Sequence, residues 1–478
     1  MEKLISLPTI WPVAAHTDNI GPGSTFVAIP GTKLNGVDFI GTALQKGATT
    51  VVVQNDAALT AELAAMIERH NAHLIRVADC RQALAAMSAA AWGNPADKLK
   101  IIGVTGTKGK TTTTYLTTHI LKTAGYKTAM ISGVNNYING QKLPSALTTP
   151  QPDYLHAFFA TCVQEDVEYV VMEASAQAFS LHRLDGISFD GIIFTNLSQE
   201  HAEFYNSIED YFAAKCQMLA HCKPGTAAIV NIDDQWGKQF AALHPSASTV
   251  SRVEKAADYY IEHATNDLKG LALTLTTNNF TYTIACAHLF GTFNAYNTAD
   301  AVALTLQLGI SYDIIKQAIA TFTGVPGRME GYALANGAYA IIDYAHTPSS
   351  FEQVIPMLKS VTPQLVVVFG AGGDRDKTKR PIMGNIAARY ADIVIVTADN
   401  PRSEDAAAIA AQIMAGVADN DKVKVICELD RKSAIEKAYR LAQQESIILL
   451  LGKGPDEYQI IGKEKFYFSD KQTILGCF

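Results

Sequence analysis

The sequence predicts an α/β protein built from three domains, and two observations lead to this prediction. The chain has 478 residues, which is too long for one hydrophobic core. Short apolar runs typical of buried strands alternate with helical periodicity through most of the chain, a pattern that favours mostly parallel sheets covered by helices. We therefore expect a small α/β domain over 1–98, a central mostly parallel sheet domain over 99–325, and a Rossmann-like doubly wound domain over 326–478.

The composition narrows the classes of function. The chain is 48% hydrophobic and 18% charged, with a formal net charge of −7 and no long basic run, so a nucleic-acid partner is not expected. No apolar run reaches the roughly 18–20 residues that cross a bilayer, and the N-terminus lacks a basic-then-apolar signal, so we expect no membrane insertion. The seven cysteines are scattered without a C-x-x-C pair, which indicates neither zinc nor a disulfide framework and fits a reducing cytoplasm.

The first 98 residues alternate short apolar runs with a helical pattern. We predict strands over 26–29 and 49–53 and a helix over 57–70. No catalytic pattern is visible in this region, so we interpret it as a binding or docking domain.

The central region opens on a glycine-rich turn, Gly106-x-x-Gly109-Lys110-Thr111, between a predicted strand over 101–104 and a predicted helix over 111–124. The glycines allow backbone N–H groups to surround an anion, and the helix N-terminus adds partial positive charge. The lysine can reach the outer phosphates of a nucleotide, and the threonine hydroxyl can hold Mg²⁺. The pattern therefore predicts a phosphate-binding P-loop; the alternative is an ordinary strand-to-helix turn rich in glycine.

Polar side chains follow the next predicted strands of this region, which lie over 127–132, 169–172 and 191–195. Glu173 comes directly after the second of these strands, and His201 comes after the third. In open parallel sheets, ligands lie outside the carboxyl ends of the strands, so both side chains are candidates for a magnesium–nucleotide site. The alternatives are a helix-capping or surface acid for Glu173 and a hydrogen-bonded surface histidine for His201.

Two further positions of the central region are ambiguous when they are considered alone. Lys215 lies in a helical stretch, where a lysine is normally solvated or paired. Asn294 precedes an alanine-rich helix that we predict over 298–308. Its amide can cap that helix or can read a purine, and both interpretations stay open.

The last region alternates strands and helices again. The predicted strands are 340–343, 365–369, 392–397, 423–427 and 446–451. Polar loops follow four of them, at 343–346, 370–376, 399–402 and 452–457. Together these loops predict a cleft with carboxylates and arginines, which suits a zwitterionic or carboxylate-bearing small molecule. Surface ion pairs are the alternative for any single loop.

These motifs occur together along nearly the whole chain. They are Thr105-Gly-Thr-x-Gly-Lys-Thr111, Met172-Glu-Ala-Ser175, Phe194-Thr-Asn-Leu-Ser198 with His201, Tyr211-x-x-Ala-Lys215, Gly291-x-Phe-Asn294-x-x-Asn297, Val325-Pro-Gly-Arg-Met-Glu330, Asp343-Tyr-Ala-His-Thr-Pro348 and Gly372-Gly-Asp-Arg-Asp376. As a set they resemble the Mur ligases, which are ATP-dependent, amide-forming enzymes of peptidoglycan precursor synthesis. The resemblance implies a bacterial cytoplasmic enzyme, and we expect a monomer.

The resemblance also implies a role for each motif residue. Catalysis is implied for Lys110, Glu173, His201 and Lys215. ATP binding is implied for Thr107, Lys108, Gly109, Lys110, Thr111, Thr112, Asn294, Arg328 and Asp343. Mg²⁺ is expected on Thr111, Glu173, His201 and on Lys215, whose amine is expected to be carbamylated (N6-carboxylysine). A UDP-muramoyl-dipeptide is expected on Thr148, Thr149, Ser175 and Arg183, and an amino-acid substrate on Arg375, Asp399, Asn400, Arg402, Gly452 and Asp456.

The substrate-facing motifs bear on which carboxylate and which amino acid are joined. Residues 399–402 and 452–454 are similar to those of family members that add meso-2,6-diaminopimelate to the dipeptide. Asp18 stands where the family has an arginine, and Asp456 is one methylene shorter than the usual glutamate. A paralogous ligase that joins a different amino acid to a different carboxylate therefore stays open. A nucleotide-binding regulatory protein without catalysis also stays open, although the retained Lys110 and its catalytic partners argue against it.

Overall fold

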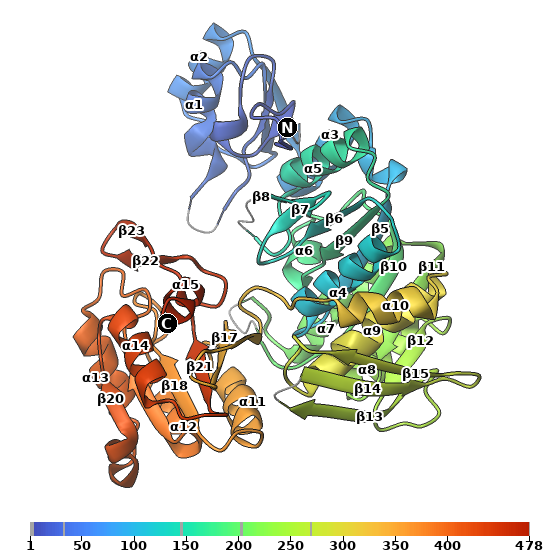
Figure 1. Ribbon diagram of the computed structural model, residues 1–478. Coiled ribbons are helices and arrows are strands. Elements are labelled where there is room, and N and C mark those ends of the chain that lie inside the picture. Colours follow the sequence, from blue (N-terminus) through green and yellow to red (C-terminus); the bar gives the residue numbers. More distant parts are fainter. Residues whose placement is uncertain (1–3, 32–33, 144–146, 201–203, 268–269, 478) are drawn as a thin grey trace. The chain divides into compact units, whose positions relative to one another are not determined.

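A computed structural model (Figure 1) describes residues 4–31, 34–143, 147–200, 204–267 and 270–477. The chain forms two compact units. The first unit is made of Met1–Tyr260, Thr276–Phe280 and Tyr296–Ala318, and the second of Ile261–Leu275, Thr281–Ala295 and Ile319–Phe478. None of the helices in the described parts of the chain is long and apolar enough to cross a membrane.

The first unit begins with a small sheet of parallel strands. Its strands, in their order across the sheet, are β1 (Val13–Ala14), β2 (Thr25–Val27), β3 (Thr50–Gln54) and β4 (His73–Val77). Its helices are α1 (Ile40–Gln45), α2 (Ala61–Arg69) and α3 (Cys80–Ala91). Alternate residues of β3 enter different clusters, because Val51 and Val53 pack with Ile40 while Val52 packs with Leu84. Both faces of this sheet are therefore covered by helices, as period-two alternation requires.

A larger sheet follows in the same unit. Its strands run in the order β12-β11-β10-β5-β9-β6-β7-β8 and are parallel except around β7. Their bounds are β5 (Lys100–Thr105), β6 (Thr128–Ile131), β7 (Asn136–Ile138), β8 (Gln141–Leu143), β9 (Tyr169–Glu173), β10 (Phe189–Phe194), β11 (Cys222–Asn231) and β12 (Ser248–Ser251). The predicted strands at 101–104, 127–132, 169–172 and 191–195 are present, so the mostly parallel central sheet is confirmed.

Helices lie between the strands of this sheet along the chain. They are α4 (Lys110–Thr123), α5 (Pro152–Gln164), α6 (Ala176–Ser180), α7 (Ile208–Cys216) and α8 (Gln235–Leu243). Two more helices, α9 (Phe293–Gln307) and α10 (Tyr312–Ala320), come later in the chain. The sequence placed the start of the alanine-rich helix at Thr298, which is wrong: α9 begins at Phe293. Asn294 therefore lies inside the helix rather than before it, so the capping interpretation of this residue is also wrong.

Three strands that come after β12 had no counterpart in the sequence prediction. They are β13 (Tyr259–Asp267), β14 (Gly270–Thr276) and β15 (Thr281–Cys286). β13 begins by pairing in parallel with β12, Tyr259 against Val250, so these strands continue the larger sheet in the order β15-β14-β13-β12. The burial of β14 alternates along the strand, with Leu271, Leu273 and Leu275 buried. This period-two pattern marks a half-buried strand, and it was readable from the sequence.

The second unit contains a doubly wound sheet. Its strands run β16-β17-β21-β18-β19-β20, and only β16 is antiparallel to its neighbour. Their bounds are β16 (Glu330–Ala333), β17 (Tyr339–Asp343), β18 (Leu365–Phe369), β19 (Ile393–Val396), β20 (Val425–Cys427) and β21 (Ile447–Leu451), and a hairpin of β22 (Tyr458–Ile461) and β23 (Glu464–Tyr467) follows.

Helices cover both faces of this second sheet. They are α11 (Pro348–Lys359), α12 (Lys379–Tyr390), α13 (Ala406–Met414), α14 (Arg431–Leu441) and α15 (Asp470–Leu475). Val367 packs in one buried cluster with Phe351 of α11, whereas Val368 packs in another with Ile435 of α14. Alternate residues of β18 thus face opposite helical layers, and the Rossmann-like architecture predicted from the sequence is confirmed.

Candidate active site

The glycine-rich turn lies between β5 and α4, where an anion can approach backbone N–H groups. Gly106 has φ +143° and a side chain there would meet Thr195 Oγ1 at 2.0 Å, while Gly109 has φ +87° and its Cβ would lie 2.3 Å from Asn297 Oδ1. Neither position can take a larger residue without displacing its neighbour. The N-cap residue of α4 is Gly109, which has no side chain to cap the first turn. The first turn of a helix presents backbone N–H groups and the positive end of the helix dipole, which favour an anion.

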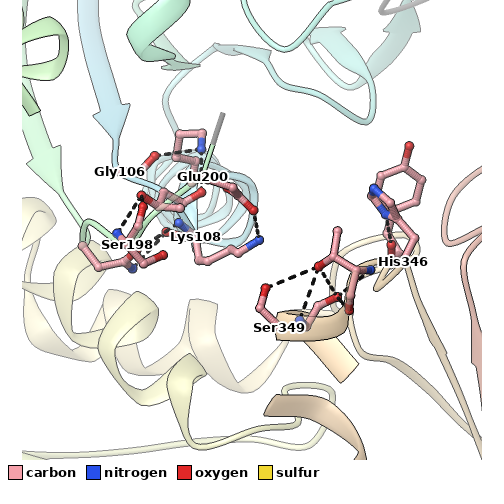
Figure 2. A network of polar contacts seen from close by, with 12 residues as sticks. Gly106, Lys108, Ser198, Glu200, His346 and Ser349 are labelled. Atoms are coloured by element: carbon pink, nitrogen blue, oxygen red, sulfur yellow. Dashed lines mark hydrogen bonds and ion pairs between the residues drawn. The ribbon is translucent and has the colours of Figure 1, made fainter. Parts of the chain in front are cut away.

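Two lysines of the turn have different partners, because Lys110 contacts its own loop and Lys108 contacts the segment after β10. Lys110 Nζ donates to the carbonyl oxygens of Gly106 and Thr107, both at 2.9 Å. Lys108 Nζ forms an ion pair with Glu200 Oε1, which Figure 2 shows beside Gly106 and Ser198. Both side chains are only half-buried. Because Lys110 is already partly exposed to solvent, its ammonium group can exchange the two carbonyl oxygens for the oxygens of a phosphate without leaving a buried site.

The segment after β10 braces the phosphate loop. Thr107 Oγ1 donates to Ser198 O at 3.2 Å and accepts from Ser198 N at 3.0 Å, and the backbone N–H of Lys108 donates to Asn196 Oδ1 at 3.0 Å (Figure 2). Thr195 Oγ1 and Asn196 Nδ2 both donate to Lys108 O, at 2.6 and 3.1 Å. These reciprocal bonds fix the backbone of the loop before any ligand is present, which is the preorganisation that phosphate binding requires.

Glu173 and Thr111 meet at the carboxyl edge of the sheet. Glu173 ends β9, whose register pairs it with Val104 of the adjacent strand β5. Its side chain is 2% exposed, and its Oε1 accepts hydrogen bonds from Thr111 Oγ1 at 2.8 Å and from Gly133 N at 2.9 Å. Glu173 is therefore neither a surface acid nor a helix cap; Ser175 caps the following helix α6. The structure brings this carboxylate and the threonine hydroxyl together beside Lys110.

His201 lies outside the described residues, so its place relative to Glu173 is not part of this geometry. Within the described ranges, no group of three or more His, Cys, Asp or Glu side chains is arranged to hold a metal ion. Thr111 and Glu173 nevertheless place two side-chain oxygen atoms 2.8 Å apart, and oxygen atoms are the ligands that Mg²⁺ prefers.

Lys215 is fully buried in α7, in contrast to the solvated lysine expected from its local sequence. Its Nζ donates to Gly106 O at 2.8 Å and lies 4.3 Å from the centre of the Tyr211 ring. Burial, together with the charge of Lys110, lowers the pKa of Lys215 well below its ordinary value, and Glu200 opposes this shift only partly. An amine with a lowered pKa is a better nucleophile at neutral pH. The phosphate loop carbonyl of Gly106 therefore contacts two lysines of different character.

The two asparagines of the Gly291–Asn297 motif have different surroundings. Asn294 is 2% exposed and its Nδ2 donates to Phe290 O at 2.6 Å. Asn297 Oδ1 accepts from Thr113 Oγ1 at 3.4 Å and is the atom that a side chain at Gly109 would strike. Asn297 therefore packs against the phosphate loop, a role that the sequence pattern did not assign.

The residues expected to hold the muramoyl substrate form one connected group. Thr149 Oγ1 donates to Glu173 O at 2.8 Å and accepts from Ser175 N at 3.1 Å. Arg183 Nη1 donates to Thr149 O at 2.9 Å, and its Nε is buried without a hydrogen-bond partner in the described structure. Burial and the nearby Arg81 lower the pKa of Arg183. Thr148 is adjacent to this group and lies close to Gly133.

In the second unit, Asp343 ends β17 and organises the segment around Arg328. Its carboxylate accepts the backbone N–H of Met329 and of Ala345, both at 2.8 Å. Burial raises the pKa of Asp343, while the Arg328 charge and these N–H groups act in the opposite direction. The Arg328 guanidinium lies 4.6 Å from the Tyr344 ring centre. Close by in sequence, His346 Nδ1 contacts Tyr344 O at 2.7 Å (Figure 2).

The expected amino-acid residues cluster at the carboxyl edge of the second sheet. Asp399 and Asn400, after β19, are 7% and 6% exposed, and a Cβ at Gly452 would meet Asp399 Oδ2 at 2.5 Å. Arg402 donates from Nη1 to Gly373 O at 2.8 Å. Arg375 is exposed, and its Nη1 donates to Asp374 O at 3.4 Å.

Asp456 completes this edge from the loop after β21. Burial raises the pKa of the Asp456 carboxyl, and Lys453 and a hydrogen bond from Tyr458 oppose that shift. Lys453 Nζ is fully buried, 3.3 Å from Asn400 Oδ1 and 3.9 Å from Asp399 Oδ1. The sequence analysis quoted this lysine within a motif but assigned it no role.

Two buried arginines under the same edge were also missed. Arg431 donates to both oxygens of Asp470, at 2.8 and 2.6 Å, and to Leu451 O at 3.0 Å. Arg380 forms a two-bond ion pair with Glu404, at 2.9 and 3.0 Å. Arg380 and Glu404 are 24 positions apart, and Arg431 and Asp470 are 39 positions apart. Local sequence patterns therefore gave no signal for either pair.

A strand, a glycine-rich loop and a helix with a lysine and a threonine at its start, with an acid at the end of the neighbouring strand, define a phosphate-loop α/β protein. Three family descriptions match this chain. Residues 13–92 match the Mur ligase family catalytic domain, 104–305 the Mur ligase middle domain, and 327–454 the Mur ligase glutamate ligase domain. The chain belongs to the Mur ligase family, which confirms the resemblance and the enzyme class.

Individual relatives cover nearly the whole chain. A UDP-N-acetylmuramoyl-L-alanyl-D-glutamate–2,6-diaminopimelate ligase of Syntrophomonas wolfei is 36% identical and spans 96% of this chain and 93% of the relative. The enzyme of the same name from Synechococcus elongatus is 39% identical over 94% and 90% of the two chains. A solved structure of a ligase with this name is similar with a TM-score of 0.68 and 27% identity, over 98% of this chain and 94% of the other.

Proposed function

We propose that this chain is an ATP-dependent ligase that joins meso-2,6-diaminopimelate to UDP-N-acetylmuramoyl-L-alanyl-D-glutamate, forming an amide in peptidoglycan precursor synthesis. The names of its relatives support this substrate pair. The observation that carries the proposal is the hydrogen bond of 2.8 Å between Thr111 Oγ1 and Glu173 Oε1, beside Lys110 at the start of α4. This arrangement suits a nucleotide whose terminal phosphate is to be transferred.

The phosphate loop supplies the ATP contacts in this proposal. Backbone N–H groups over 107–112 would surround the phosphates, and Lys110 would exchange its bonds to Gly106 O and Thr107 O for phosphate oxygens. Asn294, Arg328 and Asp343 would contact the rest of the nucleotide. Mg²⁺ held by Thr111, Glu173 and His201 would neutralise phosphate charge.

The proposed reaction has two chemical steps. An oxygen of the D-glutamate side-chain carboxylate attacks the γ-phosphorus of ATP, the bond to ADP breaks, and an acyl phosphate forms. The unprotonated amine of the amino acid then attacks the acyl carbon, and phosphate leaves as the amide forms. The first step brings an anion to a polyanion, so Lys110 and Lys108 act mainly by lowering that charge repulsion.

Lys215 has a separate part in the proposal. Its buried amine, with a pKa lowered by burial and by Lys110, would add to CO₂ and lose a proton to give a carbamate anion. That change places a negative charge beside the phosphate loop, where the unprotonated amine carried none. The carbamate would be a further ligand for Mg²⁺, which resolves the presence of a lysine among metal-binding oxygens.

The two other substrates are assigned to groups of polar side chains. Thr148, Thr149, Ser175 and Arg183 would hold the UDP-muramoyl-dipeptide, together with a substrate-binding domain over 1–98. Arg375, Asp399, Asn400, Arg402, Gly452 and Asp456 would hold the amino acid within the domain over 326–478, whereas the phosphate loop of the domain over 99–325 would hold the phosphates of ATP. The cysteines of the described chain are free, which suits a cytoplasmic setting.

One observation favours a second candidate, a paralogous ligase for a different carboxylate. Asp18 stands in the N-terminal sheet region with its carboxylate 3.6 Å from Lys46 and 3.4 Å from His16, largely exposed. A carboxylate at this place would not attract the UDP half of the muramoyl substrate, where an arginine would.

A phosphate-release assay tests the proposal and separates the candidates. We expect inorganic phosphate from ATP only when UDP-N-acetylmuramoyl-L-alanyl-D-glutamate and meso-2,6-diaminopimelate are both present, with the tripeptide product detected by mass spectrometry. Turnover with another amino acid and another carboxylate, but not with this pair, would indicate the paralogous ligase. Equal phosphate release with neither substrate would contradict a ligase of either kind.

A further inference from the structure

A buried ammonium group lies at the carboxyl edge of the second sheet, near Asp399 and Asn400. We call this edge, where the residues expected to bind the amino acid lie, the amino-acid edge. Lys453 follows Gly452 at the end of β21, and its side chain is 0% exposed. Its Nζ lies 3.3 Å from Asn400 Oδ1 and 3.9 Å from Asp399 Oδ1. A buried lysine of this kind cannot reach a substrate above the edge, but it can fix the residues that do.

The carboxamide of Asn400 is oriented by two donors. Its Oδ1 accepts from Lys453 Nζ and also from the backbone N–H of Ile460 at 2.9 Å. An ammonium and a peptide N–H have no acceptor to offer, so the carbonyl oxygen, and not the NH₂ group, must face them. Asn400 Nδ2 is therefore turned away from Lys453 and Ile460, and it can only donate.

Further contacts hold the segments around Lys453 in position. Gln459 Nε2 donates to Asp399 O at 2.8 Å, and Arg402 N donates to Ile460 O at 3.1 Å, so the loop after β19 is joined to strand β22. Arg431 fixes the end of β21 through Leu451 O at 3.0 Å. Burial lowers the pKa of Lys453, whereas Asp399 opposes that shift.

We propose that Lys453 is a positioning residue that locks the Asn400 carboxamide with its NH₂ group outward, so that this position reads a carboxylate of the incoming amino acid and rejects the corresponding amide. The inference rests on the proposed function for the identity of the substrate. The geometry of the lock itself involves only Lys453, Asn400 and Ile460. Without the lysine, one of the two donors that hold the carbonyl oxygen is lost, and the carboxamide can rotate by about 180° to present its oxygen instead.

The first test uses Lys453→Met, which keeps the length of the side chain and removes its charge. We expect kcat/KM for meso-2,6-diaminopimelate to fall by about 10–100-fold, while KM for ATP is unchanged. Diaminopimelate has two carboxylates, so two monoamides can be made, and the wild type is expected to reject one of them more strongly. For that monoamide, we expect the ratio of kcat/KM for the acid to kcat/KM for the amide to fall by about 10-fold in the variant. Lys463→Met, at an exposed lysine in the turn between β22 and β23, is the matched control and should leave both quantities unchanged.

A second measurement does not depend on ligation. The Ile460 N–H is held by Asn400 Oδ1, so its hydrogen exchange should quicken by roughly 10-fold in Lys453→Met and stay at the wild-type rate in Lys463→Met. Unchanged exchange together with an unchanged acid-over-amide preference would overturn the proposal. A wild-type enzyme that ligates no amino acid would count against the proposed function, while the exchange rate would still decide whether Lys453 locks Asn400.

Asn400→Asp keeps the proposal testable if Lys453→Met fails to fold. A carboxylate at this position still accepts from Lys453 and Ile460, so we expect wild-type exchange at Ile460. It offers no outward donor, so the preference for the acid over the monoamide should be lost by about 10-fold or more. Retention of that preference would contradict a donor role for Asn400.

Discussion

The phosphate loop of the first unit and the amino-acid edge of the second unit hold their cations in opposite ways. Lys110 is half-buried and bonded to two carbonyl oxygens of its own loop. Lys453 and Arg431 are fully buried and are paired with side chains that are distant in the sequence, Asn400 and Asp470. The first arrangement allows a lysine to leave its partners for a phosphate, because the carbonyl groups lose little hydrogen-bonding free energy when water replaces the ammonium group. The second fixes the segments at this edge, because separating a buried charge from its partner is costly.

The largest expected effect is the loss of phosphate release when Lys110 of the phosphate loop is replaced. In the proposed mechanism, Lys110→Met removes the charge that would face the transferred phosphate, so phosphate release should fall by about 10³-fold. Lys122→Met, at the exposed end of the same helix α4, should keep wild-type activity. Phosphate-release kinetics measure both variants. Activity of Lys110→Met within a few-fold of the wild type would contradict this distinction between the two regions, because Lys110 would then have no part in catalysis.

The next effect concerns the buried lysine of the first unit. Lys215→Ala should lower phosphate release by about 10²-fold, with partial rescue by added short-chain carboxylates that take the place of the carbamate. Lys215→Arg is the matched control, since it keeps a positive charge and cannot form the carbamate, and it should lose activity without rescue. Full activity of Lys215→Ala in the same assay would remove the carbamate from the account.

A smaller effect is expected at the amino-acid edge. Arg402→Lys keeps the charge but loses the planar fork that grips a carboxylate, so KM for the amino acid should rise by roughly 10-fold with KM for ATP unchanged. Arg389→Lys, at an exposed arginine of α12, is the control. A rise in KM for ATP instead would show that this edge serves the nucleotide, and the distinction between the two regions would fail.

The smallest effect tests whether the second region is held by buried ion pairs. Arg380 and the N–H of Asp374 lower the pKa of Glu404 from its ordinary 4.5 to about 2. The folded state therefore binds fewer protons than the unfolded chain between these values, so the pair stabilises the protein fully above pH 4.5 and loses this effect as the pH falls to about 2. Glu404→Gln should lower Tm at pH 7, and the difference from the wild type should shrink over that acid range.

Thermal unfolding of the wild type and of Glu404→Gln at several pH values measures this dependence. Glu428→Gln, at a partly exposed acid 4.0 Å from Lys437, is the control and should change Tm little. A difference between Glu404→Gln and the wild type that stays constant down to pH 2 would contradict the stabilising role of the pair.

The phosphate loop was predictable from the sequence for a physical reason. Positive φ at Gly106 and Gly109 and a lysine at the helix start are local requirements, so they leave a local pattern. The strand ends that carry Glu173 and Asp399 were predictable because apolar runs stop where side chains meet the ligand edge. The position of each side chain at its edge then follows from the parallel order of the strands.

The supports of the second region were not predictable in the same way. Lys453 and Asn400 are 53 positions apart, and Arg431 and Asp470 are 39 apart, so their pairing depends on the three-dimensional fold. The burial of Lys215 was missed because its helix has charged neighbours in its first turn. The start of α9 was misplaced because Gly291 suggested a turn longer than the structure has, so Asn294 seemed to precede the helix.

A crystal structure of the protein with Mg²⁺ and β,γ-methylene-ATP tests the central claim most directly. The account predicts that Lys110 Nζ leaves Gly106 O and Thr107 O for oxygens of the terminal phosphate, with the metal ion bound to Thr111 Oγ1 and the Glu173 carboxylate. A nucleotide bound elsewhere, with Lys110 still on its own carbonyl oxygens and no metal at Glu173, would contradict it.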